Sequence, residues 1–230
     1  MATKRPWVPW KRYTIVETDE ALYIPKPNEP QNDLHWLNTA SIPQSVQFMI
    51  DCLPTLRRLL GRFGRYDVPI RVLDVGTGSG AGASLLATLY SGQILGYTLK
   101  VDALDRAPHV QRYARAKFPM INYMIGEAWD LRGDRPWEVV ICSHLIEHMD
   151  DPIGFARHLQ SLASQWVLIY APYNETNPIP GHKVILDNDL LAKMGAQDVE
   201  IIASPGWNPL VHKDPKCVLF TLPGTAGIKG

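Results

Sequence analysis

The sequence predicts an α/β fold, a doubly wound and mostly parallel sheet with helices on both faces. The first observation is a short apolar run that leads directly into an acid and three alternating glycines, between Val72 and Gly80. The second is the regular alternation of strand-like and helix-like apolar runs that follows, because such alternation implies parallel strands joined by right-handed crossovers. In sheets of this kind, ligands bind outside the carboxyl ends of the strands.

The first strand is predicted at residues 71–75, and the glycine turn follows it. A side chain at such a turn would clash with a ligand or with the next helix, and glycine also permits positive φ. We therefore expect Gly76, Gly78 and Gly80 to mark a close approach of backbone to ligand. The glycines alone do not identify the ligand, because Gly76, Gly78 and Ala81 also fit the dinucleotide-binding pattern G-x-G-x-x-G/A.

Two later strands end in acids. The second strand is predicted at residues 99–104 and is followed by Asp105, which is placed to accept hydrogen bonds from ribose hydroxyls. Asp105 comes later than the spacing of about 20 residues that the dinucleotide fingerprint prefers. The third strand, at residues 121–125, leads into Gly126-Glu127-Ala128, where Glu127 can accept from an adenine amino group.

The other elements continue the alternation. Ser41-Ile42-Pro43 is typical of a helix start. The remaining helices and strands are expected at residues 44–63, 81–90, 108–117, 138–142, 152–163, 166–171, 188–193, 199–203 and 217–222.

The order of these motifs resembles the class I S-adenosylmethionine-dependent methyltransferases. Their pattern is an Asp-x-Gly-x-Gly-x-Gly turn, an acid closing strand two, a Gly-Asp-Ala-like turn and an apolar fourth strand. The resemblance spans roughly residues 70–200, and the chain departs from it at Glu127 and Glu138, where aspartate is commoner. It implies a seven-stranded Rossmann-like sheet whose last two strands, 199–203 and 217–222, form an antiparallel edge hairpin.

The resemblance also implies S-adenosylmethionine as cofactor. By it, the three glycines approach the amino-acid part, Asp105 holds the ribose hydroxyls, and Glu127 with Ala128 faces the adenine. The expected cofactor-binding residues are Asp74, Gly76, Gly78, Gly80, Asp105, Arg106, Glu127, Ala128 and Ser143.

A second cluster of polar residues follows the fourth strand. If this segment turns helically, His144, Glu147 and His148 share one face, because they are spaced i, i+3 and i+4. His182 lies in the loop after the fifth strand, which the topology returns to the same edge. Imidazole and carboxylate groups are ordinary ligands of a divalent transition ion, so these four residues are candidate metal ligands.

This segment resembles one subset of the family, the metal-dependent O-methyltransferases of ubiquinone biosynthesis and of small-RNA 3′ ends, which use Glu-x-x-Glu-His. Glu147-His148 and His182-Lys183 match the subset, whereas His144 replaces its first glutamate. The replacement exchanges a hard carboxylate oxygen for a softer imidazole nitrogen, which disfavours Mg²⁺ and favours Mn²⁺, Fe²⁺, Co²⁺ or Zn²⁺.

A second interpretation stays open, because an Ile-Glu-His turn also resembles family members without a metal. There the glutamate and histidine serve packing, capping or direct acid/base catalysis. Without a metal, His144 or His148 would act as general base, a step typically worth about 10² to 10⁴ in rate. With one, the ion would lower the pKa of the attacking hydroxyl.

Composition bounds the remaining questions. The chain has 230 residues, 46% of them hydrophobic, and no net formal charge, which argues against disorder and against a surface broadly suited to polyanions. Its 3 cysteines are odd in number and lack close metal-like spacing, which argues against a secreted disulfide framework and favours a reducing compartment. With no apolar run of ~18 residues and no signal peptide, we expect a cytoplasmic protein without a membrane partner.

We expect an amino-terminal arm or lid at residues 1–40, a single methyltransferase domain at 41–224 and a flexible tail at 225–230. The leading function is methylation of an oxygen, with nitrogen as the alternative, on a small molecule. The alternatives are 2′-O-methylation of an RNA terminus, NAD(P)-dependent oxidoreduction, and a cofactor-binding scaffold without activity. The sequence leaves the acceptor and the oligomeric state open.

Overall fold

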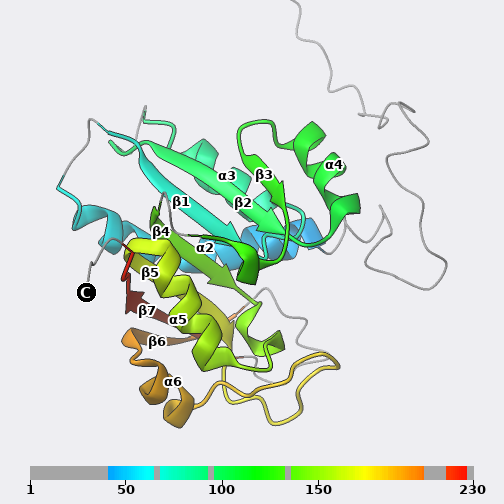
Figure 1. The fold of residues 1–230 in the computed structure, drawn as a ribbon, viewed down its shortest axis with the longest axis vertical. Helices are drawn as coiled ribbons and strands as arrows, with labels where there is room; N and C mark the ends of the chain where they lie inside the picture. The colour runs from blue at the N-terminus through cyan, green and yellow to red at the C-terminus, as the bar shows by residue number, and fades with distance from the viewer. Residues whose placement is uncertain (1–40, 65–67, 93–95, 133–135, 205–215, 227–230) are drawn as a thin grey trace, which may run out of the picture.

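The chain forms one seven-stranded sheet with the strand order β3-β2-β1-β4-β5-β7-β6 (Figure 1). A computed structural model describes residues 41–64, 68–92, 96–132, 136–204 and 216–226. The strands are β1 (Ile70–Val75), β2 (Leu99–Asp105), β3 (Asn122–Ile125), β4 (Trp137–Ser143), β5 (Ala163–Pro172), β6 (Gln197–Ala203) and β7 (Lys216–Pro223). The helices are α2 (Ile42–Gly61), α3 (Ala81–Leu89), α4 (Pro108–Lys117), α5 (Pro152–Leu162) and α6 (Asn188–Met194).

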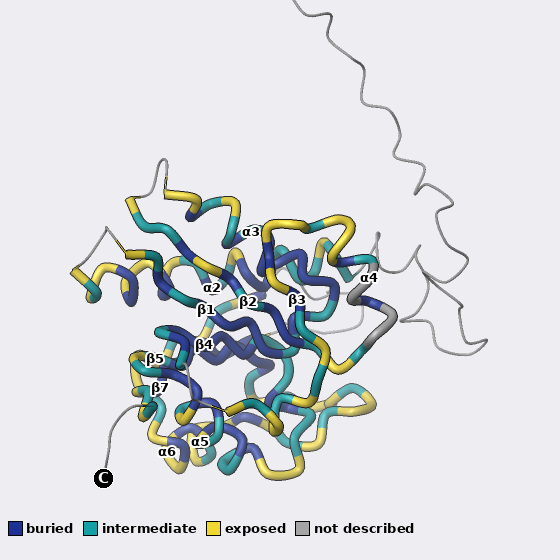
Figure 2. Tube along the Cα trace, turned by 45° about the horizontal axis from the view of Figure 1, so that its top comes forward, coloured by how far each residue is buried: buried dark blue, intermediate teal, exposed yellow. Residues whose placement is uncertain are grey.

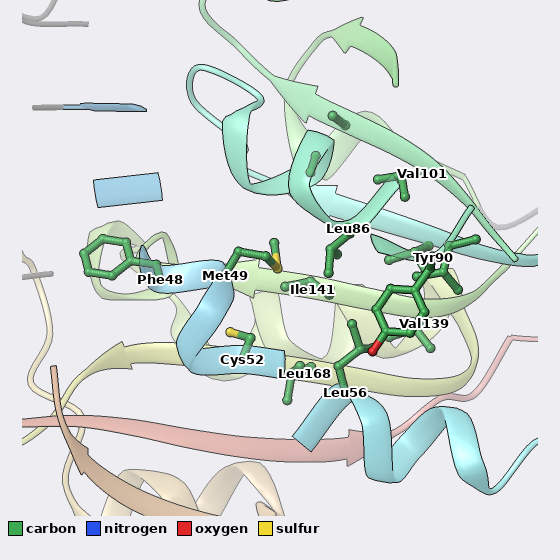
Figure 3. Packing of buried hydrophobic residues seen from close by; sticks show 14 of the residues in the cluster. Phe48, Met49, Cys52, Leu56, Leu86, Tyr90, Val101, Val139, Ile141 and Leu168 are labelled. Carbon is green, nitrogen blue, oxygen red and sulfur yellow. The ribbon is translucent and has the colours of Figure 1, made fainter. Parts of the chain in front are cut away.

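Both faces of the sheet are covered, so the central strands are buried on both sides (Figure 2). Val72 of β1 belongs to the apolar cluster formed with α2, α3 and α4, whereas the next residue, Leu73, belongs to the cluster formed with α5 and α6. Figure 3 shows the first cluster, with Met49 and Cys52 of α2 beside Ile141 of β4. The predicted doubly wound architecture is confirmed.

The strand register brings the predicted site to one edge of the sheet. β1 lies between β2 and β4 and is parallel to both, with Val75 opposite Leu104 on one side and Cys142 on the other. The glycine turn, the end of β2 and the end of β4 therefore emerge side by side. The strand order reverses here, because β2 and β3 lie on one side of β1 and β4 and β5 on the other. Doubly wound sheets bind their ligands at such a reversal.

The antiparallel edge is confirmed as well. β7 runs antiparallel to β5 and to β6, so it is inserted between them and β6 forms the edge. Most predicted boundaries lie within three residues of the observed ones. β5 begins at Ala163, directly after α5, because Ala163 already pairs with Trp137 of β4.

The segment after β4 turns helically only in part. Ile146–His148 form a short 3₁₀ turn, whereas His144 has φ +50° and lies outside it. Cys52, Cys142 and Cys217 are buried, and the described residues contain no disulfide. Among the described residues, no helix combines the length and apolarity needed to cross a membrane. The predicted arm and most of the predicted tail lie outside the described residues.

Candidate functional site

Two cavities open at the carboxyl edge of the sheet, with volumes of about 690 and 130 Å³, and Gly76 lines both. The predicted site residues on the larger cavity are Gly76, Asp105, Arg106, Glu127, Ala128 and His148. Those on the smaller cavity are Asp74, Gly76, Gly78, Ser143 and His144. Gly80, Glu147 and His182 line neither of the two. The residues predicted separately for cofactor and catalysis are thus neighbours in space.

The glycine turn is held in place by its surroundings. Gly76 has φ +75°, and a Cβ there would lie 2.9 Å from Leu145 Cδ2. Gly78 has φ +55° and lines the smaller cavity, and a Cβ there would meet no other atom within 4 Å. The Gly78 N–H donates to Asp105 Oδ2 at 2.8 Å, and its carbonyl accepts from the Tyr123 hydroxyl. The turn is therefore shaped without any ligand.

Asp105 ends β2 and faces the larger cavity. Its Oδ2 accepts the Gly78 N–H and its Oδ1 accepts the Ala107 N–H at 2.9 Å. A carboxylate offers about four lone-pair sites, so each oxygen retains capacity for another donor. The geometry suits a side chain that organises the turn and also accepts from ligand hydroxyls.

Asp74, the last acid before the turn, is only 3% exposed and accepts a hydrogen bond from Thr77 Oγ1 at 2.6 Å. Burial raises its pKa from 3.8 to about 6, against the lowering effect of the Thr77 hydrogen bond and with a smaller raising effect from Asp105. The ionised form is therefore costly in the absence of a cationic partner. A ligand ammonium in the smaller cavity would relieve that cost.

Asp74→Asn is expected to stabilise the ligand-free chain at neutral pH. The folded-state pKa lies above the unfolded one, so the native state binds the extra proton and stability falls as pH rises from about 4 through about 6. A pKa change from 3.8 to about 6 corresponds to ~3 kcal/mol. Urea unfolding should show the variant more stable by up to about 3 kcal/mol at pH 8, with no advantage at pH 4. A destabilised variant at pH 8 would contradict this.

His144 is directed toward α2. Its ring stacks on Phe48 with centroids 3.7 Å apart and meets the edge of Tyr170 at 4.9 Å. Positive φ is uncommon outside glycine, and here it accompanies a backbone hydrogen bond from the His144 N–H to the Tyr170 carbonyl. His144 Nδ1 also lies 3.4 Å from Glu147 Oε1. Phe48 was missed by sequence reasoning, because its position in α2 indicated only packing.

Three of the four candidate metal ligands converge. One ligand atom each from Glu147, His148 and His182 lies within 4.8 Å of the other two, and His144 is not part of this group. Glu147 is fully buried, and neither carboxylate oxygen accepts a hydrogen bond from the residues the structure describes. Buried carboxylates are normally hydrogen-bonded or paired with a cation, so this arrangement fits a metal ion.

Both histidines of this cluster present Nε2 to it, because their other ring nitrogens are engaged. His148 Nδ1 lies 2.9 Å from the Gly181 carbonyl oxygen, and His182 Nδ1 lies 2.7 Å from Glu175 Oε2. Both partners are acceptors, so each Nδ1 donates a hydrogen bond, and the neutral form of each ring would offer the Nε2 lone pair that a metal requires. Glu175 was missed, although a carboxylate in the same loop as His182 was the available signal.

The loop that contains His182 is hydrogen-bonded to the turn that contains Glu147. The backbone N–H of Lys183 donates to the Glu147 carbonyl at 2.7 Å, and Lys183 Nζ pairs with Asp150 Oδ2 at 2.6 Å. The donor set is one carboxylate and two neutral imidazoles, which suits Mn²⁺, Fe²⁺, Co²⁺ or Zn²⁺ better than Mg²⁺.

Comparison with known proteins shows which family the chain is similar to. A family model described as "Methyltransferase domain" matches residues 50–193. A ubiquinone biosynthesis O-methyltransferase of Xanthomonas campestris pv. campestris (strain B100) is 31% identical over 98 residues, which are 40% of this chain and 38% of the relative. A protein of the same name from Xanthomonas euvesicatoria pv. vesicatoria is 29% identical over 139 residues, 58% of this chain and 48% of that one. The matches thus span less than half the length of these relatives.

Solved structures share the fold. Magnesium protoporphyrin IX methyltransferase from Synechocystis PCC 6803, crystallised with bound SAM, superimposes with a TM-score of 0.57 at 13% identity, over 83% of this chain and 94% of that one. A methyltransferase from Bacillus halodurans C-125, described as putative in its source, superimposes with a TM-score of 0.54 at 15% identity, over 74% of this chain and 99% of its own.

Proposed function

Because the chain belongs to the class I S-adenosylmethionine-dependent methyltransferases, we propose that it methylates an oxygen of a small molecule with the help of a divalent metal ion. One observation carries this proposal: the Glu147, His148 and His182 cluster adjoins the cavity that Asp105 and Glu127 line. His148 belongs to both, so a bound acceptor can reach metal and cofactor together.

The two cavities suit the two halves of the cofactor. The larger one takes the adenosine, with Asp105 accepting from the ribose hydroxyls and Glu127 from the adenine amino group. The smaller one takes the amino-acid part, with the buried Asp74 carboxylate opposite its ammonium. A diphosphate fits poorly here, because the Gly78 N–H is already bonded to Asp105 and both carboxylates would repel the anion.

Methyl transfer needs an acceptor lone pair in line with the sulfonium methyl, so most of the rate gain comes from positioning. Glu147, His148 and His182 would hold the ion, which would supply Lewis acidity and so lower the pKa of the acceptor hydroxyl. His148 is then a ligand, and His144 lines the smaller cavity and stacks on Phe48, away from the acceptor. The acceptor hydroxyl, with its lowered pKa, therefore releases its proton to solvent.

Methyl transfer assays with labelled S-adenosylmethionine test this function. The acceptors are phenols with adjacent hydroxyls, matched phenols with one hydroxyl, amines and short RNAs. We expect turnover on the adjacent hydroxyls, its loss after chelation, and better recovery with Mn²⁺ or Co²⁺ than with Mg²⁺. Turnover that is insensitive to chelation would refute the metal, and methylation of RNA or amines alone would refute the acceptor class.

Asp105→Asn is expected to weaken binding of S-adenosylhomocysteine. Hydrogen bonds to a charged group contribute about 1.5–3 kcal/mol, which is roughly a 10- to 100-fold loss of affinity. Asp102→Asn is the matched control, because Asp102 is on the same strand, outside both cavities, and bonded to Asn122 and Trp137. Calorimetry should show weaker binding of S-adenosylhomocysteine to Asp105→Asn and unchanged binding to Asp102→Asn. Equal affinities in both variants would count against the ribose assignment.

A further inference from the structure

A carboxylate behind the metal cluster stands outside the roles described above. Glu175 lines neither cavity, yet its Oε2 lies 2.7 Å from Nδ1 of His182. The two side chains are only 14% and 2% exposed. A short hydrogen bond to a charged acceptor in such a shielded place is among the stronger contacts of this kind.

The backbone around Glu175 holds this carboxylate in place. Asn174 has φ +51°, a conformation that asparagine tolerates better than most residues, and its N–H donates to the Leu186 carbonyl at 2.8 Å. Tyr173 forms a bridge with Leu186, and its hydroxyl donates to Asn188 Oδ1 at 2.8 Å. The start of the loop is therefore anchored to its end, and Glu175 is presented toward His182 by a fixed turn.

We propose that Glu175 is a positioning residue, which fixes the tautomer and orientation of His182 and thereby sets the affinity of the Glu147, His148 and His182 cluster for a divalent ion. The inference deepens the proposed function and rests on its metal centre. With the proton held on Nδ1, His182 Nε2 faces Glu147 Oε1 at 4.0 Å. An anionic acceptor also makes the imidazole a stronger donor to a metal than a neutral one does.

The second histidine shows the contrast within the same cluster. His148 Nδ1 is held by the Gly181 carbonyl, a neutral acceptor that belongs to the backbone and persists in any side-chain variant. His148 therefore keeps its tautomer when Glu175 is changed. At His182 the corresponding acceptor is the side chain of Glu175, so a change of Glu175 acts on this ligand of the cluster through its Nδ1.

The test compares Glu175→Ala, Glu175→Gln and Glu175→Asp with Asp189→Asn, an exposed carboxylate change on the neighbouring α6. Affinities for Co²⁺ and Zn²⁺ are measured on the full chain by competition with a chromophoric chelator. We expect Glu175→Ala to lose about 10- to 100-fold in metal affinity. Glu175→Gln, which keeps a carbonyl but no charge, should lose less, and Asp189→Asn should match the wild type. Affinity for S-adenosylhomocysteine should stay unchanged in all four.

A spectroscopic readout separates positioning from folding. Nitrogen-15 shifts of the His182 ring in the metal-free chain should report the Nδ1–H tautomer, which Glu175→Ala should convert to a mixture. Wild-type metal affinity in a folded Glu175→Ala would refute this inference and leave the proposed metal centre standing. A wild-type chain that binds no divalent ion would refute the metal centre itself, and this inference with it.

Discussion

Glu147→Gln is expected to abolish binding of divalent ions and, at the same time, to stabilise the metal-free chain. The Glu147 carboxylate is fully buried and accepts no hydrogen bond from the described residues, so its charge is costly until a cation arrives. A neutral amide of the same shape carries no buried charge, so urea unfolding of the metal-free chain should show the variant more stable than the wild type.

Glu138→Gln provides the matched control for Glu147→Gln. Glu138 is a half-buried glutamate of β4, and its Oε2 accepts the backbone N–H of Arg71 at 2.8 Å. Its carboxylate has a partner, so its replacement should give no gain in stability and no change in metal affinity. A loss of stability in Glu147→Gln would indicate a structural carboxylate and would contradict the metal site.

Gly78→Ala is expected to remove cofactor binding while the chain stays folded. Gly78 lines the smaller cavity, so we expect an added methyl group to take space from a ligand there, and the left-handed conformation costs a residue with a Cβ about 1–2 kcal/mol. The strain alone should lower Tm by roughly 2–8 °C in a chain of this size. In the wild type, S-adenosylhomocysteine at about 100 times its Kd should raise Tm by roughly 5–10 °C. Gly78→Ala should show little of that rise.

Gly195→Ala separates strain from occlusion of the cavity. Gly195 has φ +74° and open space at its Cα, like Gly78, but it ends α6 and lines neither cavity. Its replacement should lower Tm by a similar amount and leave the ligand-induced rise intact. If both variants lost the rise equally, the effect at Gly78 would be one of stability and not of ligand space.

The fold was predictable because short apolar runs bounded by glycine are typical of strands that are buried on both faces. The cofactor acids were predictable for the same reason, since Asp105 and Glu127 follow strands whose carboxyl ends meet at one edge. The arrangement of the metal cluster was only partly predictable. Spacing alone placed His144 on the face of Glu147, whereas its positive φ and the Phe48 ring turn it toward the smaller cavity.

Contacts within and between loops could not be predicted from the sequence. The Glu175 hydrogen bond to His182 depends on the turn at Asn174 and on the bridge between Tyr173 and Leu186. The periodicity of apolar residues does not predict these contacts, because they depend on backbone conformations in an irregular segment. The candidate ligands were therefore visible in the sequence, while the groups that orient them appeared only in the fold.

Calorimetric titration of the wild-type chain with S-adenosylhomocysteine tests the central claim most directly, since the glycine turn, Asp74 and Asp105 are expected to form a pocket for an adenosyl amino acid. We expect saturable one-to-one binding that Asp105→Asn weakens and Asp102→Asn preserves. Saturable binding of NADH together with no heat from S-adenosylhomocysteine or S-adenosylmethionine would contradict it.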